Sequence, residues 1–249
     1  MNIVIIGAYG GIGKELSYAL HKNHNLFLGA KDTSKIDNLV FDITQDGLYE
    51  ENTHSINGAH VDASNFDSMK TFFEKANGNL NSIDCVINCV GSLLLKPAHL
   101  TSEVDLDNVF KTNVYSCFSS IKHSFKYLRK NGGSIVFFSS AASKVGLKNH
   151  EAISSAKGAI SSLVLAAAST YANYNIRVNA IAPGLVSTPL TQKIVANETS
   201  LEYSKNLHGL KRIGNPENFI PIVEALIDNK SDWITGQTIS VDGGLSNVK

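Results

Sequence analysis

A single lysine, Lys157, lies in the otherwise small and apolar stretch EAISSAKGAI at residues 151–160. Its neighbours Ala156 and Ile160 indicate a buried helix, in which an ammonium without a partner would be costly. Ser140, at the end of a predicted strand, offers a hydroxyl that could act as a hydrogen-bond donor near this charge. The plainer alternatives are a solvated lysine on the helix and a serine that only ends a strand.

A second motif with chemistry is the glycine-rich stretch GAYGGIG at residues 7–13, which directly follows the first apolar run. Glycines there allow a tight turn, close approach of the backbone to a pyrophosphate, and close packing of a helix on a strand. The free N–H groups at the start of the following helix would then face the phosphates. Because the motif lies at the first strand–helix junction, it favours a dinucleotide site over an ordinary turn.

The elements that must position these residues alternate along the whole chain. Short apolar runs predict seven strands, at 2–7, 25–30, 56–61, 83–91, 133–140, 175–184 and 237–244. Helical patterns lie between them, most clearly at 103–129, 152–173 and 216–228. Asn65 and Asn215 are candidate helix starts, and the stretch 40–56 is either a short helix or a loop. The alternation predicts an α/β fold in one domain, residues 1–249, with a single Rossmann-like doubly wound parallel sheet and helices on both faces.

Taken together, these motifs resemble the short-chain dehydrogenase/reductase family, in its compact single-domain branch. The resemblance covers essentially the whole chain. It rests on the glycine stretch, on NCVG at 88–91 where the family has Asn-Asn-Ala-Gly, and on the Pro-Gly segment IAPGLVSTPL at 181–190. It implies that the cofactor is contacted by Gly7, Gly11, Ile12, Gly13, Asp62, Asn88, Gly91, Lys157, Pro183, Gly184 and Thr188.

The resemblance also implies a catalytic set of Ser140, Lys157 and Asn113. In the family, a tyrosine gives a proton to the carbonyl oxygen as hydride arrives from the nicotinamide. The serine hydrogen-bonds the same oxygen, the lysine lies near the ribose hydroxyls and lowers the tyrosine pKa, and the asparagine helps to hold a water. For Asn113, a polar residue that caps or kinks a helix locally is the alternative.

The tyrosine position, four residues before Lys157, holds Ile153. An isoleucine cannot donate a proton, and general acid catalysis is typically worth about 10²–10⁴ in rate. Three functions stay open, and we favour the first: an NADP(H)-dependent oxidoreductase for a carbonyl or alcohol, with atypical acid–base machinery. The second is a nucleotide-binding pseudoenzyme, a sensor or partner subunit without redox turnover. The third is a non-redox lyase or isomerase on the same fold.

His150 is a candidate replacement for the missing proton donor. It lies three residues before Ile153 and seven before Lys157, which places all three on one helix face if the helix extends that far. The enoyl-reductase branch of the family carries its tyrosine at Tyr-x6-Lys, and His150 matches that position. Ser154 is adjacent in sequence but points about 100° away on a helix. The alternative for His150 is an exposed loop histidine.

The end of the second predicted strand bears on which cofactor is bound. NAD-preferring members of the family tend to have an acidic residue there, whereas this chain has Ala30 followed by Lys31. An ammonium at Lys31 would pair with a 2′-phosphate, so we predict NADP, with NAD as the alternative. Asp32 follows directly and weakens the argument, and Lys31 could be a solvated turn residue.

Charged residues balance, with 22 lysines and arginines against 22 aspartates and glutamates. The chain as a whole therefore has no electrostatic attraction for nucleic acid or an anionic membrane. We expect no membrane span and no signal peptide, and hence a cytoplasmic protein. The cysteines support no disulfide framework, and Cys85 and Cys89 are expected to be buried small side chains instead of metal ligands.

The expected partner is a small-molecule substrate. The pocket for it would be closed by a lid at about 187–212, where Tyr203 and Leu207 share one helix face. A surface helix is the alternative for this segment. The helices at 103–129 and 152–173 are expected to pair across a two-fold axis, which would give a homodimer or homotetramer.

Overall fold

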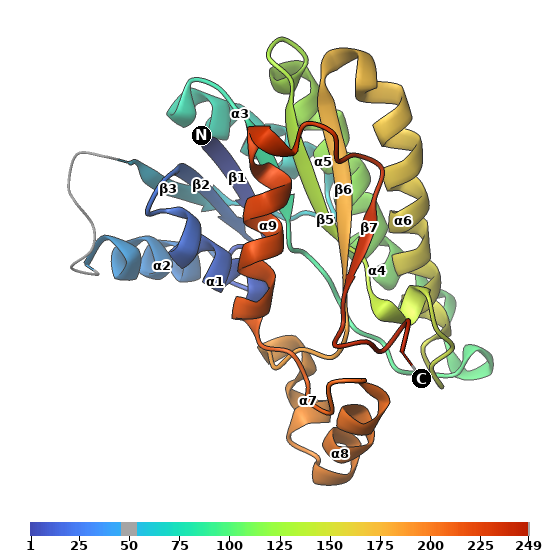
Figure 1. Cartoon of the computed structure of the whole chain (residues 1–249). Coiled ribbons are helices and arrows are strands. Elements are labelled where there is room, and N and C mark those ends of the chain that lie inside the picture. Colours follow the sequence, from blue (N-terminus) through green and yellow to red (C-terminus); the bar gives the residue numbers. More distant parts are fainter. Residues whose placement is uncertain (46–53, 249) are drawn as a thin grey trace.

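The computed structural model describes residues 1–45 and 54–248, and within them a single parallel sheet forms the centre of the protein (Figure 1). The strand order is β3-β2-β1-β4-β5-β6-β7, and every neighbouring pair is parallel. The strands are β1 Asn2–Ile6, β2 Asn25–Ala30, β3 Ile56–His60, β4 Cys85–Asn88, β5 Gly133–Phe138, β6 Ile176–Pro183 and β7 Thr238–Val241. The predicted seven-stranded, doubly wound α/β fold is confirmed.

Helices cover both faces of the sheet. The α-helices are α1 Gly11–Leu20, α2 Thr33–Gln45, α3 Phe66–Leu80, α4 Glu103–Phe110, α5 Ser116–Leu128, α6 Glu151–Tyr171, α7 Gln192–Val195, α8 Glu198–Leu207 and α9 Ile220–Ile227. One core cluster joins the sheet to apolar side chains of α1, α2 and α9, and another joins it to those of α3, α5 and α6. The strands are therefore buried on both sides, which explains their continuous apolar runs.

Capping side chains set two predicted helix starts. The Asn65 side chain accepts a hydrogen bond from the backbone N–H of Ser68 at 2.9 Å and begins α3. Asn215 precedes Pro216, the first residue of a short 3₁₀ turn that leads into α9. Both positions were predicted from residue type alone.

Several predicted boundaries differ from the structure, most of them by a few residues at the end of an element. The strand expected at 83–91 ends at Asn88, because the chain from Cys89 onward leaves the sheet and passes the backbone of Gly7. The helix expected at 103–129 is interrupted by a π-helical turn, Lys111–Tyr115, between α4 and α5. Of the ambiguous stretch 40–56, residues 40–45 belong to α2, and residues 46–53 lie outside the described part of the chain.

The strand order reverses between β1 and β4, and the carboxyl ends of the strands lie at the bottom of Figure 1. In doubly wound sheets the ligand binds at this edge, beside the point of reversal. Beyond β6 the chain projects from the same edge as α7 and α8. The two ends of this projection meet, since Gly214 donates to the Leu185 carbonyl oxygen at 2.8 Å and accepts from the Ser187 N–H at 2.9 Å.

One described helical segment, Glu151–Tyr174, is long and apolar enough to cross a membrane by length and composition alone. The expectation that no segment would pass this test is wrong. Within the fold, Ile160 and Val164 of this segment are fully buried against the sheet, together with Val178 of β6. The apolar character is that of a helix that covers a sheet.

Candidate active site

The glycine turn between β1 and α1 is shaped by close backbone contacts. Gly7 has a positive φ of 77°, and the Gly10 N–H donates to the Gly7 carbonyl oxygen at 3.0 Å. A Cβ atom on Gly13 would overlap that same carbonyl oxygen, and one on Gly11 would lie 2.6 Å from Cγ2 of Thr188. The fold therefore excludes side chains at Gly11 and Gly13, and the free N–H groups at the start of α1 form a cradle that fits a pyrophosphate.

The outer end of this cradle, after β2 and β3, carries an ion pair. Lys31 Nζ lies 2.9 Å from Asp62 Oδ2, and the Lys31 side chain stays 76% exposed. Asp62 also accepts from the Ser64 hydroxyl at 2.6 Å. The Ser64 hydrogen bond and the Lys31 ammonium together hold the pKa of the Asp62 carboxyl below its usual value.

Two further lysines lie beside the glycine turn. Lys35 Nζ is 5.3 Å from the centre of the Tyr9 ring, and Lys14 Nζ is 6.0 Å from it. Asp32 accepts from the Ser34 hydroxyl at 2.7 Å, and its other carboxylate oxygen lies 3.8 Å from Lys35 Nζ. Three ammonium groups therefore gather at the cofactor end of the site, and Lys31 and Lys35 are each paired with a carboxylate.

At the carboxyl end of β4, buried amide groups fix the path of the chain. The Asn88 side chain accepts from the Val90 N–H at 2.9 Å and donates to the Ser120 hydroxyl at 3.1 Å. The Asn113 side chain donates to the Ser92 hydroxyl at 2.8 Å and to the Val109 carbonyl oxygen at 2.9 Å. The bond to Val109 connects the π-helical turn to α4, and the bond to Ser92 connects it to the loop after β4. Asn113 therefore shapes its own helix and also supports the site.

Lys157 is buried on α6, behind the same end of β4. A Cβ atom on Gly91 would lie 3.5 Å from Lys157 Nζ and 3.4 Å from Asn113 Oδ1, so the three residues meet. Lys157 Nζ donates to the carbonyl oxygen of Phe138 at 2.8 Å. Burial lowers the pKa of Lys157 to about 8. The ammonium therefore has a polar partner within the protein, a backbone carbonyl oxygen.

Ser140 follows β5 and lines the same cavity as Lys157. Its Oγ accepts from the Ala142 N–H at 3.1 Å. Among the described residues its own hydroxyl proton has no acceptor, so that proton is available to a ligand. Ser154 points elsewhere and donates to the Ala142 carbonyl oxygen at 2.6 Å.

His150 is the residue that caps the start of α6, and it is half-buried and lines the cavity together with Ile153. Its Nδ1 lies 2.7 Å from the Lys148 carbonyl oxygen. Because a carbonyl oxygen only accepts, Nδ1 must carry a proton, and Nε2 is left to bind or release the second one. His150 is thus a loop residue, as in the alternative, but it is half-buried and borders the cavity.

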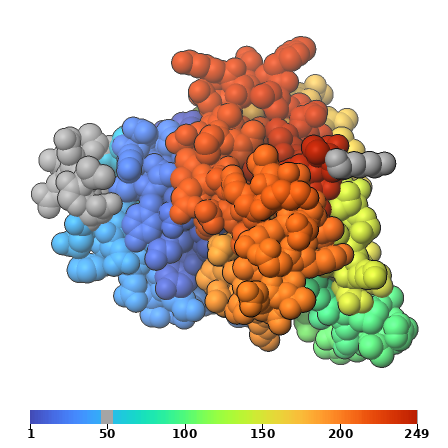
Figure 2. All heavy atoms as spheres, turned by 60° about the horizontal axis from the view of Figure 1, so that its bottom comes forward, coloured from blue at the N-terminus to red at the C-terminus, as the bar shows by residue number. Residues whose placement is uncertain are grey.

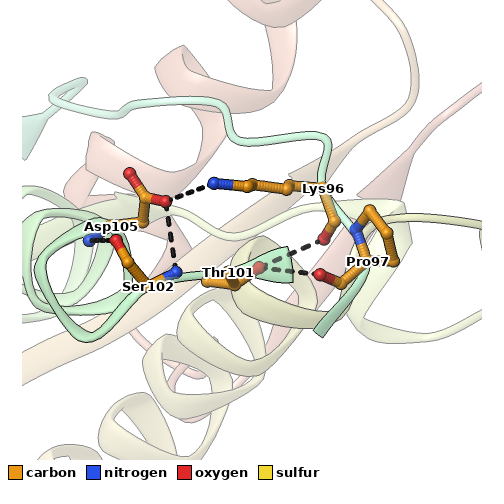
Figure 3. A network of polar contacts seen from close by, with 5 residues as sticks. All are labelled: Lys96, Pro97, Thr101, Ser102 and Asp105. Atoms are coloured by element: carbon orange, nitrogen blue, oxygen red, sulfur yellow. Dashed lines mark hydrogen bonds and ion pairs between the residues drawn. The ribbon is translucent and has the colours of Figure 1, made fainter. Parts of the chain in front are cut away.

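The loop that holds His150 is tied to the loop after β4. Asn149 adopts a positive φ of 63°, and its carbonyl oxygen accepts from the Lys96 N–H at 2.8 Å. Lys96 is held in turn, because its Nζ lies 2.7 Å from Asp105 Oδ2 near the start of α4 (Figure 3). Ser102 and Asp105 form a capping box there, and Thr101 donates back to the Pro97 carbonyl oxygen. The two loops therefore form one wall.

These residues surround a cavity of about 630 Å³ at the carboxyl ends of the strands. Of the predicted site residues it brings together Ile12, Gly91, Ser140, His150, Lys157, Pro183, Gly184 and Thr188. Asn113 lies behind this wall, and Lys31 and Asp62 lie at the far side of the glycine turn. Tyr203 and Leu207 of α8 both face the cavity, as predicted. Figure 2 shows the segment with α7 and α8, in orange, as a lobe on this side of the molecule.

His208 is a site residue that the sequence pattern did not reveal. It follows α8, is buried, and lines the cavity. Nδ1 lies 2.6 Å from the Ser204 carbonyl oxygen, and Nε2 accepts from the Leu185 N–H at 3.2 Å. A Cβ atom on Gly184 would lie 2.5 Å from Nε2, so His208 joins α8 to the Pro-Gly segment. A lone histidine after a helix carries no spacing signal.

Comparison with known proteins identifies the family. A family profile described as enoyl-(acyl carrier protein) reductase matches residues 7–246. The chain belongs to the short-chain dehydrogenase/reductase family. The match begins at the glycine turn and includes the Pro-Gly segment, and the structure brings these two into contact through Gly11 and Thr188.

Relatives within the short-chain dehydrogenase/reductase family span almost the same length. The chain is 30% identical to a 3-oxoacyl-[acyl-carrier-protein] reductase of Thermotoga maritima, over 97% of this chain and 96% of that one. It is 29% identical to a tropinone reductase homologue of Arabidopsis thaliana, over 98% and 91%. These relatives differ in what their names say they act on, so the family alone does not select a substrate.

Solved structures of short-chain dehydrogenase/reductase proteins match the whole fold. A putative gluconate dehydrogenase from Agrobacterium tumefaciens superposes with a TM-score of 0.93 at 25% identity, over 100% of this chain and 96% of that one. ElxO, solved with bound NADP, gives 0.89 at 25% identity, over 98% of each chain. Sequence and fold thus agree that the chain is a member of this family of oxidoreductases.

Proposed function

We propose that the protein is an NADP(H)-dependent oxidoreductase that transfers hydride between the nicotinamide and a carbonyl or alcohol substrate. The observation that carries this proposal is that Ser140, Lys157 and His150 line one cavity beside the glycine turn. The cavity thus combines a hydroxyl donor, a buried cation and a titratable imidazole. These are the groups that reduction of a carbonyl requires.

The residues present fit a dinucleotide. Gly11 and Gly13 let the turn pack against Thr188 and the Gly7 carbonyl oxygen, and the N–H groups at the N-terminus of α1 would hold the pyrophosphate. Asp62 would lie toward the adenine, Asn88 holds the loop after β4 that borders the cofactor, and Pro183, Gly184 and Thr188 would flank the nicotinamide end. The bound cofactor would supply the hydride.

The chain's own residues would act on the substrate oxygen. Ser140 donates its free hydroxyl proton as a hydrogen bond to the carbonyl oxygen, and Lys157 supplies positive charge as negative charge develops there. Lys157 would also hold the ribose hydroxyls, and Asn113 supports the backbone at Gly91 beside it. In reduction, the carbonyl carbon gains hydride and its oxygen gains one proton, which yields the alcohol.

His150 is the group we propose for the proton. With Nδ1–H donated to the Lys148 carbonyl oxygen, protonated His150 carries its second proton on Nε2 and releases it from there. Ile153, about one turn further along α6, cannot donate a proton. The tie between Lys96 and Asn149 holds the histidine's loop in place, which limits the motion that proton delivery would otherwise need.

NADP is the proposed cofactor, with NAD as the alternative. The Lys31 ammonium is mostly exposed and adjoins the cradle, and Lys35 and Lys14 add charge nearby. Several ammonium groups close together favour binding of the negatively charged 2′-phosphate of NADP over the neutral 2′-hydroxyl of NAD. The NADP bound to ElxO supports the same choice.

A pseudoenzyme remains the second candidate, because one observation favours it. Ile153 is only 3% exposed and packs with Val109 and Ala156 in an apolar cluster at the tyrosine position. Loss of NADPH absorbance across a panel of ketones and aldehydes tests the oxidoreductase. If the native protein consumes no NADPH and Ile153→Tyr creates turnover, the pseudoenzyme is the correct function.

Three further properties belong to this proposal. Residues 187–212 act as a lid, since α7 and α8 border the cavity and the ends of their segment meet at Gly214.

The protein acts in the cytoplasm on a small molecule. It forms a homodimer or homotetramer through α4, α5 and α6, where large apolar side chains such as Phe118 and Leu165 are exposed.

A further inference from the structure

Much of the wall of the cavity is built from hydrocarbon side chains. They come from five separate segments: the loop after β4, the loop before α6, α6 itself, the lid, and the C-terminal segment. They are Leu93, Leu95, Leu147, Ile153, Leu190, Ile194, Leu207 and Leu245. A cavity lined in this way stabilises an apolar ligand by removing its surface from water.

No carboxylate lines this cavity in the part of the chain that the structure describes. The lysines and histidines that line it are Lys148, Lys157, His150 and His208. Asp242, the buried acid near the lid, is used internally, because it accepts from the Gly244 N–H at 3.0 Å and from Ser246. A cationic substrate would therefore lose its water without gaining a counter-charge, which is costly.

Most hydroxyls that line the cavity already have protein partners. Ser204 donates to the Ser200 carbonyl oxygen at 2.8 Å, and Thr191 donates to the carbonyl oxygen of Val186. The Ser92 hydroxyl accepts from Asn113. A polyhydroxylated substrate needs many free partners, and each hydroxyl buried without one weakens binding.

The mouth of the cavity continues the apolar wall outward. Leu95, Leu190 and Tyr203 line it and are 42%, 52% and 62% exposed. Apolar side chains gathered at the rim of a pocket mark a surface that a ligand covers. The ligand's apolar part would therefore extend from the reaction centre to the rim.

We infer that the substrate is an uncharged carbonyl compound with a hydrocarbon body, such as a monocyclic or bicyclic ketone, and that ammonium ketones and sugars are poor ligands. The inference rests on the proposed function for the carbonyl group. The hydrocarbon body of the substrate is inferred from the lining of the cavity alone. Ligand-binding measurements therefore test this part of the inference separately from turnover.

Matched ketone pairs provide the test. Bicyclo[3.2.1]octan-3-one and tropinone share a bicyclic frame, but tropinone carries an ammonium at neutral pH. Cyclohexanone and a pentahydroxycyclohexanone share a ring. Binding of each to the protein with NADP⁺ is followed by ligand-observed NMR, because the oxidised cofactor prevents reduction. We expect each hydrocarbon ketone to bind at least about tenfold more tightly than its counterpart.

Equal affinities within a pair, a reversed preference, or no binding by either hydrocarbon ketone would overturn the inference. Binding with the expected preference but no oxidation of NADPH by the same ketones would leave the inference standing and remove the proposed function. The two failures are therefore distinguishable.

A rim variant tests whether the cavity wall is the cause. Leu190→Glu places a carboxylate at the mouth, and we expect it to tighten tropinone binding and weaken that of bicyclo[3.2.1]octan-3-one, each by about fivefold or more. Phe41→Glu, at an equally exposed apolar position on α2, is the control and should change neither. If the two variants behave alike, the rim does not set the preference.

Discussion

Lys157 Nζ donates to the carbonyl oxygen of Phe138 at 2.8 Å, inside a fold that buries the ammonium almost completely. This single hydrogen bond ties α6 to the end of β5 and replaces only part of the water that the ammonium has lost. A buried cation of this kind lowers stability in the charged form. Its effect on folding therefore depends on pH.

Stability should rise with pH because of Lys157. Its folded pKa of about 8 lies below the unfolded value of about 10.4, so the unfolded state holds more protons between these two pH values. The cost of the charge is fully present below about pH 8 and disappears as the pH rises toward about 10.4. Across this window the free energy of unfolding should increase by up to about 3 kcal/mol relative to Lys157→Met. Urea unfolding of both proteins measures it, and parallel pH curves would contradict the prediction.

Replacement of the proposed proton donor should affect turnover and leave cofactor binding unchanged. For His150→Ala we expect kcat to fall by about 10²–10⁴, with an unchanged Kd for NADPH, and added imidazole should restore part of the rate. His99→Ala, an exposed histidine that does not line the cavity, is the control. Turnover that is undiminished in His150→Ala excludes the histidine as donor.

The choice of cofactor should depend on Lys31. Lys31→Ala is expected to weaken NADPH binding by about tenfold and to leave NADH binding unchanged, because only NADPH has the 2′-phosphate. Fluorescence titration with both reduced cofactors measures this, with Lys75→Ala, an exposed lysine on α3, as control. Tighter binding of NADH by the native protein, or no effect of Lys31→Ala on NADPH, would refute the choice of NADP.

Assembly should depend on the exposed apolar side chains of α5 and α6. Phe118 is 54% exposed and Leu165 is 63% exposed, and burial of such side chains is a usual source of subunit association. Light scattering at micromolar concentration should give a dimer or tetramer for the native chain and a monomer for Phe118→Asp/Leu165→Asp. Circular dichroism should show that the variant remains folded. A monomeric native protein would end this proposal.

The sheet was predictable because its strands are buried on both faces, so that their apolar runs stand out from the sequence. β2 was predicted at the residues where it occurs, Asn25–Ala30. The end of β4 was not, because Cys89 to Gly91 are as apolar as the strand itself. The hydrogen bond from the Val90 N–H to the Asn88 side chain and the close approach to the backbone of Gly7 set the path of the chain where the strand ends.

The site was predictable where a residue's role follows from local backbone geometry. Gly13 must be glycine because of the Gly7 carbonyl oxygen, and both lie in one turn. The roles of Ser92 and His208 depend on partners that are distant in sequence, Asn113 for the first and Leu185 for the second. The apolar wall of the cavity is similar, since its leucines come from segments that meet only after folding.

The neck of the lid, where Gly214 bonds to both Leu185 and Ser187, has an evolutionary consequence. Because the two ends are held side by side by the rest of the fold, the entropy of closing the intervening loop changes only slowly with its length. Beyond Thr188, which contacts the glycine turn, the loop could be lengthened, shortened or exchanged between descendants of one gene. The sheet, the nucleotide cradle and Lys157 would remain in place. The lid loop can therefore change the substrate, while the sheet and the nucleotide cradle keep the mode of cofactor binding. These two parts of the chain can evolve separately.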